Sequence, residues 1–264
     1  MALILKTVAL ATFAALAIAA PALAADAVTP TEQAPPAPLV DGWKYQASIY
    51  GWATALNGDV GIRGLPPAHV DLSAWDAIQH LDGAFAGSLM ANDGTWLLFA
   101  DFLYAKVKAD YDFKRSSGSG DFEQEQILFT ALAGHRIPLA VENLQLFGTI
   151  GLRYQHYKAT LDIDPERFRS ISRSGSKDWV DPVIGLYAHY DFTPKWFLDA
   201  MVDIGGFGVS SHFTTQDTVA VGYNWNDHIS STLGYRVLYT NYDKGGFSYD
   251  ATQHGIISSV IIKF

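Results

Sequence analysis

Eight charged or titratable side chains stand at alternating positions of segments whose other positions are apolar. Every second side chain of an extended segment points to the same side, so these eight are expected to share one face. Acids and bases brought together in an enclosed space form a hydrogen-bonded network, because an unpaired buried charge is costly. The alternative is a narrow polar pore whose conductance these charges tune. The set is Lys44, Asp101, Arg153, Asp181, His189, Asp199, Asp203 and Arg236.

A second group has the composition of a hydrolytic site. Ser210, Ser211 and His212 are adjacent, with Asp203 shortly before them and Asp178 expected nearby. A serine activated by histidine is a common nucleophile, but spacing alone fixes no geometry between nucleophile and base. A solvated turn is the favoured interpretation, so no catalytic residue is predicted and an outer-membrane hydrolase is kept as the weakest alternative.

Metal, cofactor and nucleic-acid chemistry find little support. The chain has no cysteine, and the scattered His80 and His254 lack metal-ligand spacing, so no metal site and no cofactor are predicted. The full chain has a net charge of −9; removing residues 1–24, whose one charged residue is Lys6, leaves 17 basic against 27 acidic residues, a net charge of −10. Without a basic patch, nucleic acid is excluded as a partner.

One run between Pro165 and Lys177 is basic and serine-rich. Arginine binds phosphate in a bidentate manner, so on an outer rim this run would contact the phosphates of lipopolysaccharide. A mobile solvated loop is the alternative. The basic residues of the run are Arg167, Arg169, Arg173 and Lys177.

The N-terminal region predicts export. An apolar run from Val8 to Ala20 follows Lys6 and precedes Pro21 and small residues, which is typical of a secretory signal peptide covering residues 1–24. Residues 25–42 are rich in Pro and Ala and are expected to form a periplasmic leader. The folded domain is predicted to comprise residues 43–264.

The remaining chain predicts an all-β protein. Alternation of polar and apolar residues recurs from segment to segment, and several segments of about 11 to 15 residues suit tilted strands that cross a membrane. Aromatic residues gather at the segment ends, as an interfacial girdle requires. We therefore predict a transmembrane antiparallel up-and-down β-barrel in a Gram-negative outer membrane. The ten strands expected are 43–55, 84–91, 95–109, 122–136, 143–158, 179–191, 196–206, 213–225, 228–241 and 251–264.

The connections alternate between short turns and longer loops, which places both ends of the barrel at the periplasmic rim. Eight or twelve strands are alternatives to ten, since Asn57-Gly58 is a good hairpin turn that would add a short strand. In the first long connection Asp71 or Ser73 is suited to cap a short helix that packs on the rim or crosses a mouth of the barrel.

The last strand ends on an aromatic residue preceded by apolar residues at alternate positions. This pattern resembles the signal by which the barrel-assembly machinery recognises outer-membrane barrels. The residues that carry it are Val260, Ile262 and Phe264.

Several short motifs carry a family resemblance. They are Val70 to Asp82, Phe99 to Phe102, Trp179 to Pro182, Asp203 to Val209, Gly222-Tyr223 and Gly234 to Arg236. In these motifs the chain resembles a widespread group of proteobacterial outer-membrane β-barrel proteins, small barrels of the outer membrane protein A and W type. The resemblance implies a fold and a location but no reaction. Where that group continues Val-Gly-Ser-Asp, this chain has Val209-Ser210-Ser211-His212.

These observations favour a non-enzymatic integral barrel with a structural or interaction role and a largely filled polar lumen. A narrow porin-like channel for small solutes is the second possibility. Outer-membrane lipid and lipopolysaccharide are the expected partners, and no ligand is indicated.

Overall fold

The computed structural model describes residues 42–61, 68–112, 118–165 and 171–264. The predicted signal peptide and leader fall on residues outside these ranges. Within them, no helix is both long and apolar enough to cross a membrane.

The described chain is almost entirely strand. The elements are β1 (Lys44–Gly61), β2 (Ala68–Leu72), α1 (Ala74–Gln79), β3 (Leu81–Asn92), β4 (Trp96–Asp112), β5 (Gly118–Ile137), β6 (Leu144–Pro165), β7 (Ile171–Asp191), β8 (Trp196–Gly205), β9 (Phe213–Asn224), β10 (Ile229–Lys244) and β11 (Phe247–Lys263).

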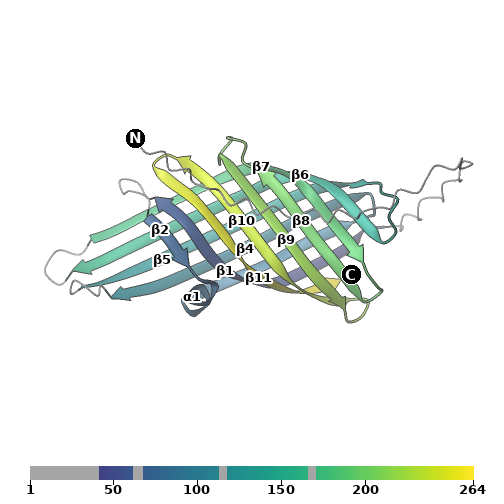
Figure 1. The fold of residues 1–264 in the computed structure, drawn as a ribbon, viewed down its shortest axis with the longest axis horizontal. Coiled ribbons are helices and arrows are strands. Elements are labelled where there is room, and N and C mark those ends of the chain that lie inside the picture. The colour runs from purple at the N-terminus through teal and green to yellow at the C-terminus, as the bar shows by residue number, and fades with distance from the viewer. Residues whose placement is uncertain (1–41, 62–67, 113–117, 166–170) are drawn as a thin grey trace, which may run out of the picture. The chain divides into compact units, whose positions relative to one another are not determined.

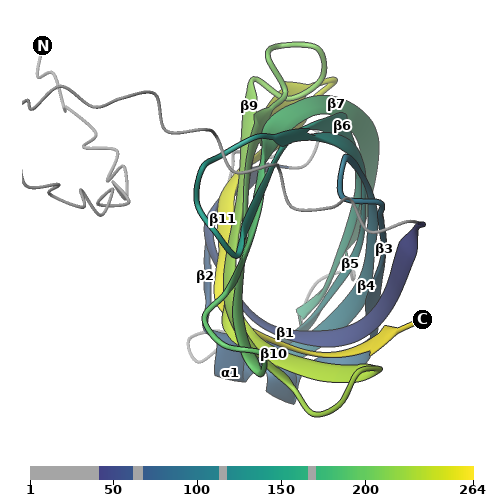
Figure 2. The ribbon, with the colours of Figure 1, turned by 90° about the vertical axis from the view of Figure 1, so that its right-hand side faces the viewer.

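Each long strand pairs in antiparallel fashion with the next strand along the chain, and the first and last strands close the sheet (Figures 1 and 2). The closing ladder between β1 and β11 runs from Gln46 opposite Lys263 to Gly61 opposite Ser248. Every β-strand edge would otherwise expose unpaired amides and carbonyls, so closure satisfies the backbone of both terminal strands. The predicted ten-strand antiparallel barrel is confirmed, and β2 is an eleventh, short strand that pairs with residues 56–60 of β1.

The chain does not reverse at Asn57-Gly58. There β1 continues, because Asn57 pairs with Thr252 of β11 on one side and with Asp71 of β2 on the other. The two neighbouring ladders hold the segment extended, so the extra strand comes from residues 68–72 rather than from 59–63.

Three neighbouring strands, β5 (20 residues), β6 (22 residues) and β7 (21 residues), are much longer than predicted, and they form part of the hairpins that project farthest from the barrel in Figure 1. β1 (18 residues) is also longer than its predicted range 43–55. The segments 110–121 and 159–178, predicted as loops, consist largely of paired strand: Asp110 lies opposite Asp121, and Lys158 lies opposite Ser176. The added stretches of β5 (118–121) and β7 (171–178) contain few apolar residues, so their sequences show no hydrophobic alternation although the hydrogen-bonded ladder continues. Hydrophobic periodicity therefore underestimates strands that leave the membrane.

Local chemistry explains the tight turns. Asp93 accepts hydrogen bonds from the backbone amides of Trp96 (2.6 Å) and Thr95 (2.9 Å). These two bonds favour the carboxylate and hold the pKa of Asp93 below its ordinary value. Gly245 and Gly246 both have positive φ (67° and 77°), as a two-residue hairpin turn of the primed type requires, which is why β10 and β11 meet without the long loop predicted there.

The predicted short helix is confirmed as α1. Ser73 is its N-cap, and the Ser73 hydroxyl accepts a hydrogen bond from the amide of Asp76 at 3.2 Å. The helix packs outside the wall beside β1 and does not cross a mouth of the barrel (Figure 2). Trp75 and Ile78 on this helix are exposed.

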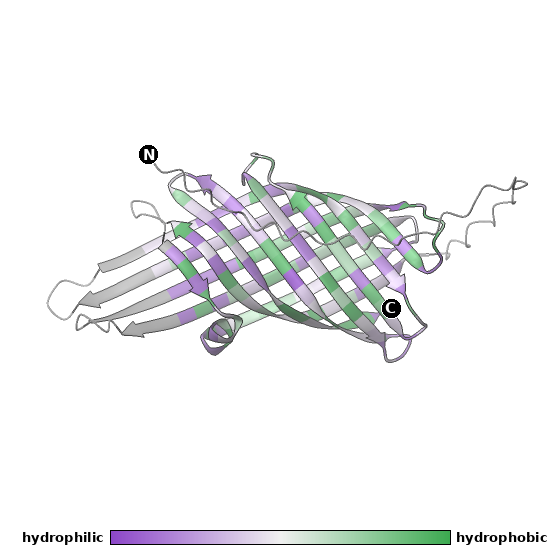
Figure 3. Ribbon diagram, in the orientation of Figure 1, coloured by the Kyte–Doolittle hydropathy of each residue, from purple (hydrophilic) through white to green (hydrophobic). Residues whose placement is uncertain are grey.

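The two faces of the wall differ in chemistry, and hydropathy alternates along the strands in Figure 3. The outward face carries large exposed apolar side chains on all ten barrel strands, with exposed fractions up to 67% at Ile49. The inward face carries the buried polar and aromatic residues described next. One outward residue from each strand in order is Ile49, Leu89, Leu98, Phe129, Ile150, Ile184, Val202, Val221, Leu233 and Val260.

Candidate functional site

The lumen of the barrel is the candidate site because it collects buried charges. Alternation along each strand turns one residue in two inward. Five of the eight predicted charged residues are at most 4% exposed: Asp101 on β4, Arg153 on β6, Asp181 on β7, Asp203 on β8 and Arg236 on β10. Each has polar partners inside the barrel, as buried charge requires.

Arg153 forms the centre of one polar layer. Its Nη2 donates to Asp203 Oδ2 at 2.5 Å, and the two side chains are completely buried. The Nε of Arg153 donates to the Thr130 hydroxyl at 3.3 Å, and Nη1 donates to the Thr214 hydroxyl at 3.4 Å. These three partners come from β8, β5 and β9, so the one guanidinium of β6 connects three other strands of the barrel through the lumen.

Arg236 forms a second ion pair. Its Nη2 donates to Asp101 Oδ2 at 3.0 Å and to Gln216 Oε1 at 2.7 Å. Its Nη1 donates to the Tyr50 hydroxyl at 3.0 Å, and that hydroxyl in turn donates to Asp101 Oδ1 at 2.9 Å. The guanidinium also lies over the ring of Trp52 at 4.8 Å, so it is held by charge, hydrogen bonds and an aromatic face together.

Asp181 binds a loop rather than a base. Its carboxylate accepts the amide of Ser211 at 2.7 Å, the hydroxyl of Ser211 at 2.5 Å and the indole N–H of Trp179 at 3.0 Å. Ser211 belongs to the connection between β8 and β9 and is completely buried. The carboxylate therefore fixes that connection against the inside of the barrel.

His189 and Asp199 pair nearer the end with the short turns. The His189 Nδ1 lies 2.7 Å from Asp199 Oδ1, and the Tyr187 hydroxyl donates to the same oxygen at 2.8 Å. Lys44, the eighth predicted residue, is the first residue of β1 and is exposed at the rim. Among the described residues it makes no side-chain hydrogen bond or ion pair, so it does not join the buried network.

A layer of glutamines lies beyond the charged layers. Gln126 and Gln253 exchange two amide hydrogen bonds, at 2.9 Å and 2.7 Å, between β5 and β11. Gln126 also donates to the Tyr157 hydroxyl at 3.0 Å. Gln155 accepts from the Tyr157 hydroxyl at 3.4 Å and from the Thr240 hydroxyl at 3.2 Å.

Four stacked aromatic rings cross the lumen next to the glutamines. The ring centroids of Tyr249 and Tyr157 are 4.4 Å apart, those of Tyr157 and Trp179 5.5 Å, and those of Trp179 and Tyr242 4.2 Å. The rings belong to β11, β6, β7 and β10, and β6 and β11 lie on opposite walls of the ten-strand barrel. All four rings are at most 5% exposed, so they fill the cross-section together with Phe247 and Leu56.

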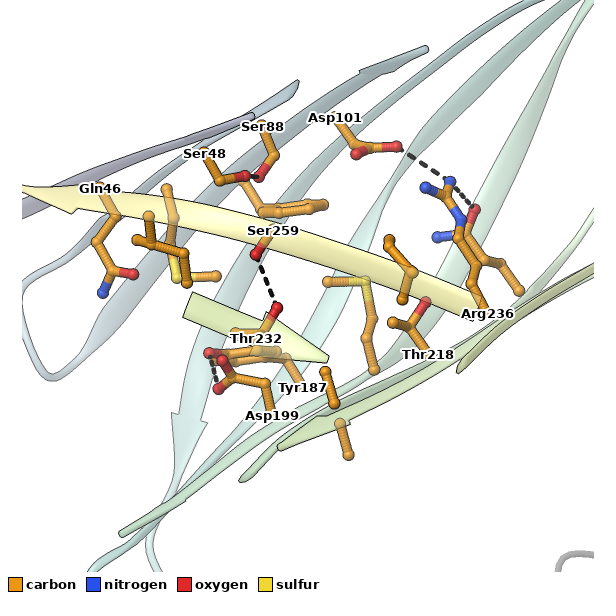
Figure 4. Close-up of a pocket in the computed structure, with 18 residues that line it drawn as sticks. Gln46, Ser48, Ser88, Asp101, Tyr187, Asp199, Thr218, Thr232, Arg236 and Ser259 are labelled. Carbon is orange, nitrogen blue, oxygen red and sulfur yellow. Dashed lines mark hydrogen bonds and ion pairs between the residues drawn. The ribbon is translucent and has the colours of Figure 1, made fainter. Parts of the chain in front are cut away.

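The part of the lumen nearer the short turns contains an apolar cluster and a cavity. Leu97, Phe147 and Tyr187 are buried there and pack with two methionines. Beside them lies a cavity of about 140 Å³, which has room for a few water molecules. Figure 4 shows its lining, which includes Arg236 and Asp101 and the hydroxyls of Ser48, Ser88, Thr218, Thr232 and Ser259.

The residues of the possible hydrolytic group do not form a nucleophile and base. The Ser211 hydroxyl donates to Asp181, and His212 is an exposed residue whose backbone amide donates to Asn241. Asp203 pairs with Arg153. Among the described residues no hydrogen bond joins a serine of this group to His212.

The predicted lipopolysaccharide contacts are only partly described. Arg167 and Arg169 lie outside the described residues. Arg173 and Lys177 belong to β7 rather than to a loop, since the ladder between β6 and β7 continues to Ile163 opposite Ile171. At the other end of the barrel, Val260, Ile262 and Phe264 all point outward and are 54 to 70% exposed. Their roles in lipid binding and assembly stay predictions.

Sequence reasoning missed the aromatic stack and the glutamine layer. The gathering of aromatic residues at segment ends predicts that Tyr157 and Trp179 belong to the girdle, whereas the structure places both inside the lumen. Their alternation with Arg153, Gln155 and Asp181 on the same strands signals that they point inward. No signal in the sequence of a single strand shows that rings from opposite walls meet.

Comparisons with known proteins find matches among solved structures, but none among family models or curated proteins. No family model and no curated protein matches the chain, so the resemblance to small barrels of the A and W type stays a prediction. Among solved structures, the chain is similar to the translocator domain of the autotransporter NalP from Neisseria meningitidis, with 12% identity over 85% of this chain and 90% of that chain and a TM-score of 0.46.

Two further structures show the same kind of likeness. The outer membrane protease OmpT from Escherichia coli has 12% identity over 85% of this chain and 96% of that chain, with a TM-score of 0.46. The attachment invasion locus protein Ail of Yersinia pestis has 16% identity over 85% of this chain and all of that chain, with a TM-score of 0.35. These neighbours are outer-membrane β-barrels, and the likeness concerns the barrel fold alone. Within the described residues, no group of three or more His, Asp or Glu residues is arranged to hold a metal ion.

Proposed function

We propose that this chain is an integral protein of the Gram-negative outer membrane whose barrel is closed by its own side chains. Its role is then structural or one of interaction, rather than solute conduction or hydrolysis. The observation that carries the proposal is the crossing of the lumen by buried side chains at several levels: the aromatic stack, the glutamine pair and the two arginine pairs.

The outward face supports membrane placement. Exposed apolar side chains surround the barrel on every strand, and such a continuous apolar surface is rare on a soluble monomer. Aromatic residues mark both edges of this band, as in barrels held between two interfaces. They include Trp96, Trp196 and Phe264 near the short turns, and Phe85, Phe213 and Tyr239 near the long hairpins.

Interior packing supports the closed state. An empty barrel lumen would leave the Arg153 and Arg236 guanidiniums in contact with water, yet both are at most 2% exposed. Barrels of sixteen or more strands hold an aqueous channel, whereas a barrel of about this size is narrow enough for side chains to meet across it. The lining of the 140 Å³ cavity includes Arg236 and Asp101 but no residue of the aromatic stack or of the glutamine pair.

The proposal is tested by planar-bilayer recording of the purified protein lacking residues 1–24. We expect no stable conductance steps, because no ion passes the stacked rings without displacing them. Reproducible steps at low voltage would overturn the closed lumen and favour the narrow channel. Mobility on unboiled gels, which is faster for an intact barrel, shows that the recorded protein is folded, and fractionation of cell membranes tests the location.

A further inference from the structure

One acidic side chain interrupts the apolar outer face. Asp217 points outward from β9, where its Cα partners are Val202 of β8 and Val237 of β10. Along β9 it lies six residues from Tyr223, at the edge of the apolar band near the short turns, and four residues from Phe213, at the edge near the long hairpins. With an axial rise of about 2.5 Å per residue in a tilted strand, Asp217 lies roughly 15 Å from the aromatic girdle near the short turns.

An ionisable residue at this depth is costly in lipid and usually pairs with another polar group. Among the described residues, no hydrogen bond or ion pair engages the Asp217 carboxylate. Outward residues on other strands of the barrel are apolar, for example Phe129 on β5 and Leu152 on β6. The acid is therefore a property of one face of the barrel.

A base lies on the same face, one strand beyond β10. Val237 is the Cα partner of both Asp217 on β9 and His254 on β11, so the three residues form one row across the strands. Two strand spacings separate the acid from the imidazole by about 10 Å, which is too far for a hydrogen bond within one barrel. The His254 Nδ1 lies 2.6 Å from the hydroxyl of Tyr235, which also faces outward on β10.

We infer that the outer face of β9, β10 and β11 is the interface of a two-fold symmetric dimer of this chain. A two-fold axis parallel to the barrel axis and facing Val237 places each Asp217 opposite β11 of the second copy. Because the strands tilt, His254 lies about 6 Å nearer the long hairpins than Asp217 does. The Asp217 carboxylate of one copy therefore faces the hydrogen-bonded pair of Tyr235 and His254 in the other copy, and not the imidazole alone.

Charge complementarity favours a second copy over lipid or another protein. A two-fold interface presents the same patch twice, so an acid and a base placed on either side of the axis satisfy each other twice. Apolar contacts give little preference for protein over lipid tails, because both are apolar. Paired polar groups favour contact with protein, because lipid tails offer no polar partner. The face carries both partners of the pair, and exposed apolar residues of the same three strands, among them Val221, Leu233 and Ile256, surround it.

The inference rests on the membrane placement proposed above, and its test uses the absence of cysteine from the chain. In intact outer membranes, Val237→Cys at the axis is expected to cross-link to itself through a short bismaleimide. Leu152→Cys, outward on β6, is the matched control and is expected to stay monomeric. Equal cross-linking of both variants, or cross-linking of Val237→Cys only to other proteins, would overturn the dimer.

Charge variants test the pairing itself in the Val237→Cys background. Asp217→Asn and His254→Gln are each expected to lower the cross-linked fraction about three- to tenfold, the range of one or two polar contacts in a membrane. The exchange Asp217→His with His254→Asp is expected to restore it. An unchanged fraction in both single variants would contradict the inference.

Failure of the dimer and failure of the membrane placement are distinguishable. Variants that sediment with outer membranes and show folded gel mobility but do not cross-link overturn the dimer alone. Variants found in the soluble periplasmic fraction overturn the placement on which it rests.

Discussion

At the residue scale, the barrel contains two kinds of ion pair that differ greatly in energetic weight. Lys106 and Glu123 meet at 2.8 Å on the surface with a quarter or more of each side chain exposed. Such pairs contribute about 0–1 kcal/mol, because water already solvates both charges. Arg153 and Asp203 are completely buried, so removing one partner leaves the other charge without solvent or counter-charge.

The first prediction concerns this buried pair. Arg153→Met should lower the free energy of unfolding by about 3–5 kcal/mol, because it leaves the Asp203 carboxylate uncompensated. The double variant Arg153→Met with Asp203→Leu should be less destabilised than the single one, since it removes both charges. Urea unfolding in detergent micelles measures both values. Lys106→Met is the surface control, and its free energy of unfolding is expected to fall by at most about 1 kcal/mol. If Arg153→Met lowered the free energy of unfolding no more than Lys106→Met does, the prediction would be wrong.

Partner choice inside the lumen could not be read from the sequence. Alternation indicates that Arg153, Asp203, Arg236 and Asp101 point inward, and the structure places all four there. Which acid meets which base depends on the stagger of strands around the closed barrel, which no single strand encodes. Lys44 follows the same alternation but lies at the rim, where the strand has only begun.

At the scale of elements, alternation predicted the ten barrel strands but not their outer ends. The hairpin of β6 and β7 continues as a ladder through Thr160 opposite Ser174, where the β7 strand reads Ser172-Arg173-Ser174-Gly175-Ser176 and has no apolar face. Hydrophobic periodicity detects a strand by its apolar face and gives no signal where the sequence has none. The tight turn at Gly245-Gly246 was hidden for the same reason, inside a polar stretch.

The second prediction belongs to the connection between β8 and β9. Ser211→Ala removes the hydroxyl that donates to Asp181, while the backbone amide of Ser211 still donates. Hydrogen exchange of residues 206–212 is therefore expected to accelerate by about tenfold, the equivalent of a buried hydrogen bond of roughly 1–1.5 kcal/mol. Asp181→Ala loses both bonds and should accelerate exchange further.

Ser210→Ala is the matched control for this connection. Ser210 adjoins Ser211 but makes no side-chain hydrogen bond among the described residues, so its exchange is expected to remain at the parental rate. Equal acceleration in the Ser210 and Ser211 variants would show that the loop responds to any loss of polarity and that Asp181 does not hold it.

At the scale of the whole molecule, closure of the lumen is distributed over several levels. The aromatic stack unites β6, β7, β10 and β11, the glutamine pair joins β5 to β11, and the arginine pairs join β4 to β10 and β6 to β8. Each level bridges strands that are distant in the sequence. The wall could be predicted from the sequence because its pairs are sequential neighbours, whereas these bridges appear only once the barrel is closed.

The last prediction follows from this distribution. Removing the stack alone, with Tyr157→Ala and Trp179→Ala, should leave the barrel non-conducting because the charged layers still cross the lumen. Removing only the charge pair, with Asp101→Ala and Arg236→Ala, should also leave it closed behind the stack. The fourfold variant keeps only the Arg153–Asp203 pair and the glutamine pair across the lumen, and with both other levels removed it is expected to show conductance steps in planar bilayers.

Stability limits this experiment, since each buried aromatic ring cut back to alanine costs about 3–5 kcal/mol. Unboiled gel mobility selects the variants that fold, and valine at 157 and 179 is the milder replacement if alanine does not. Steps from the stack variant alone would show that the charged layers do not occlude the lumen. A folded fourfold variant that never conducts would mean that the glutamine pair, with the Arg153 layer, is sufficient to close it.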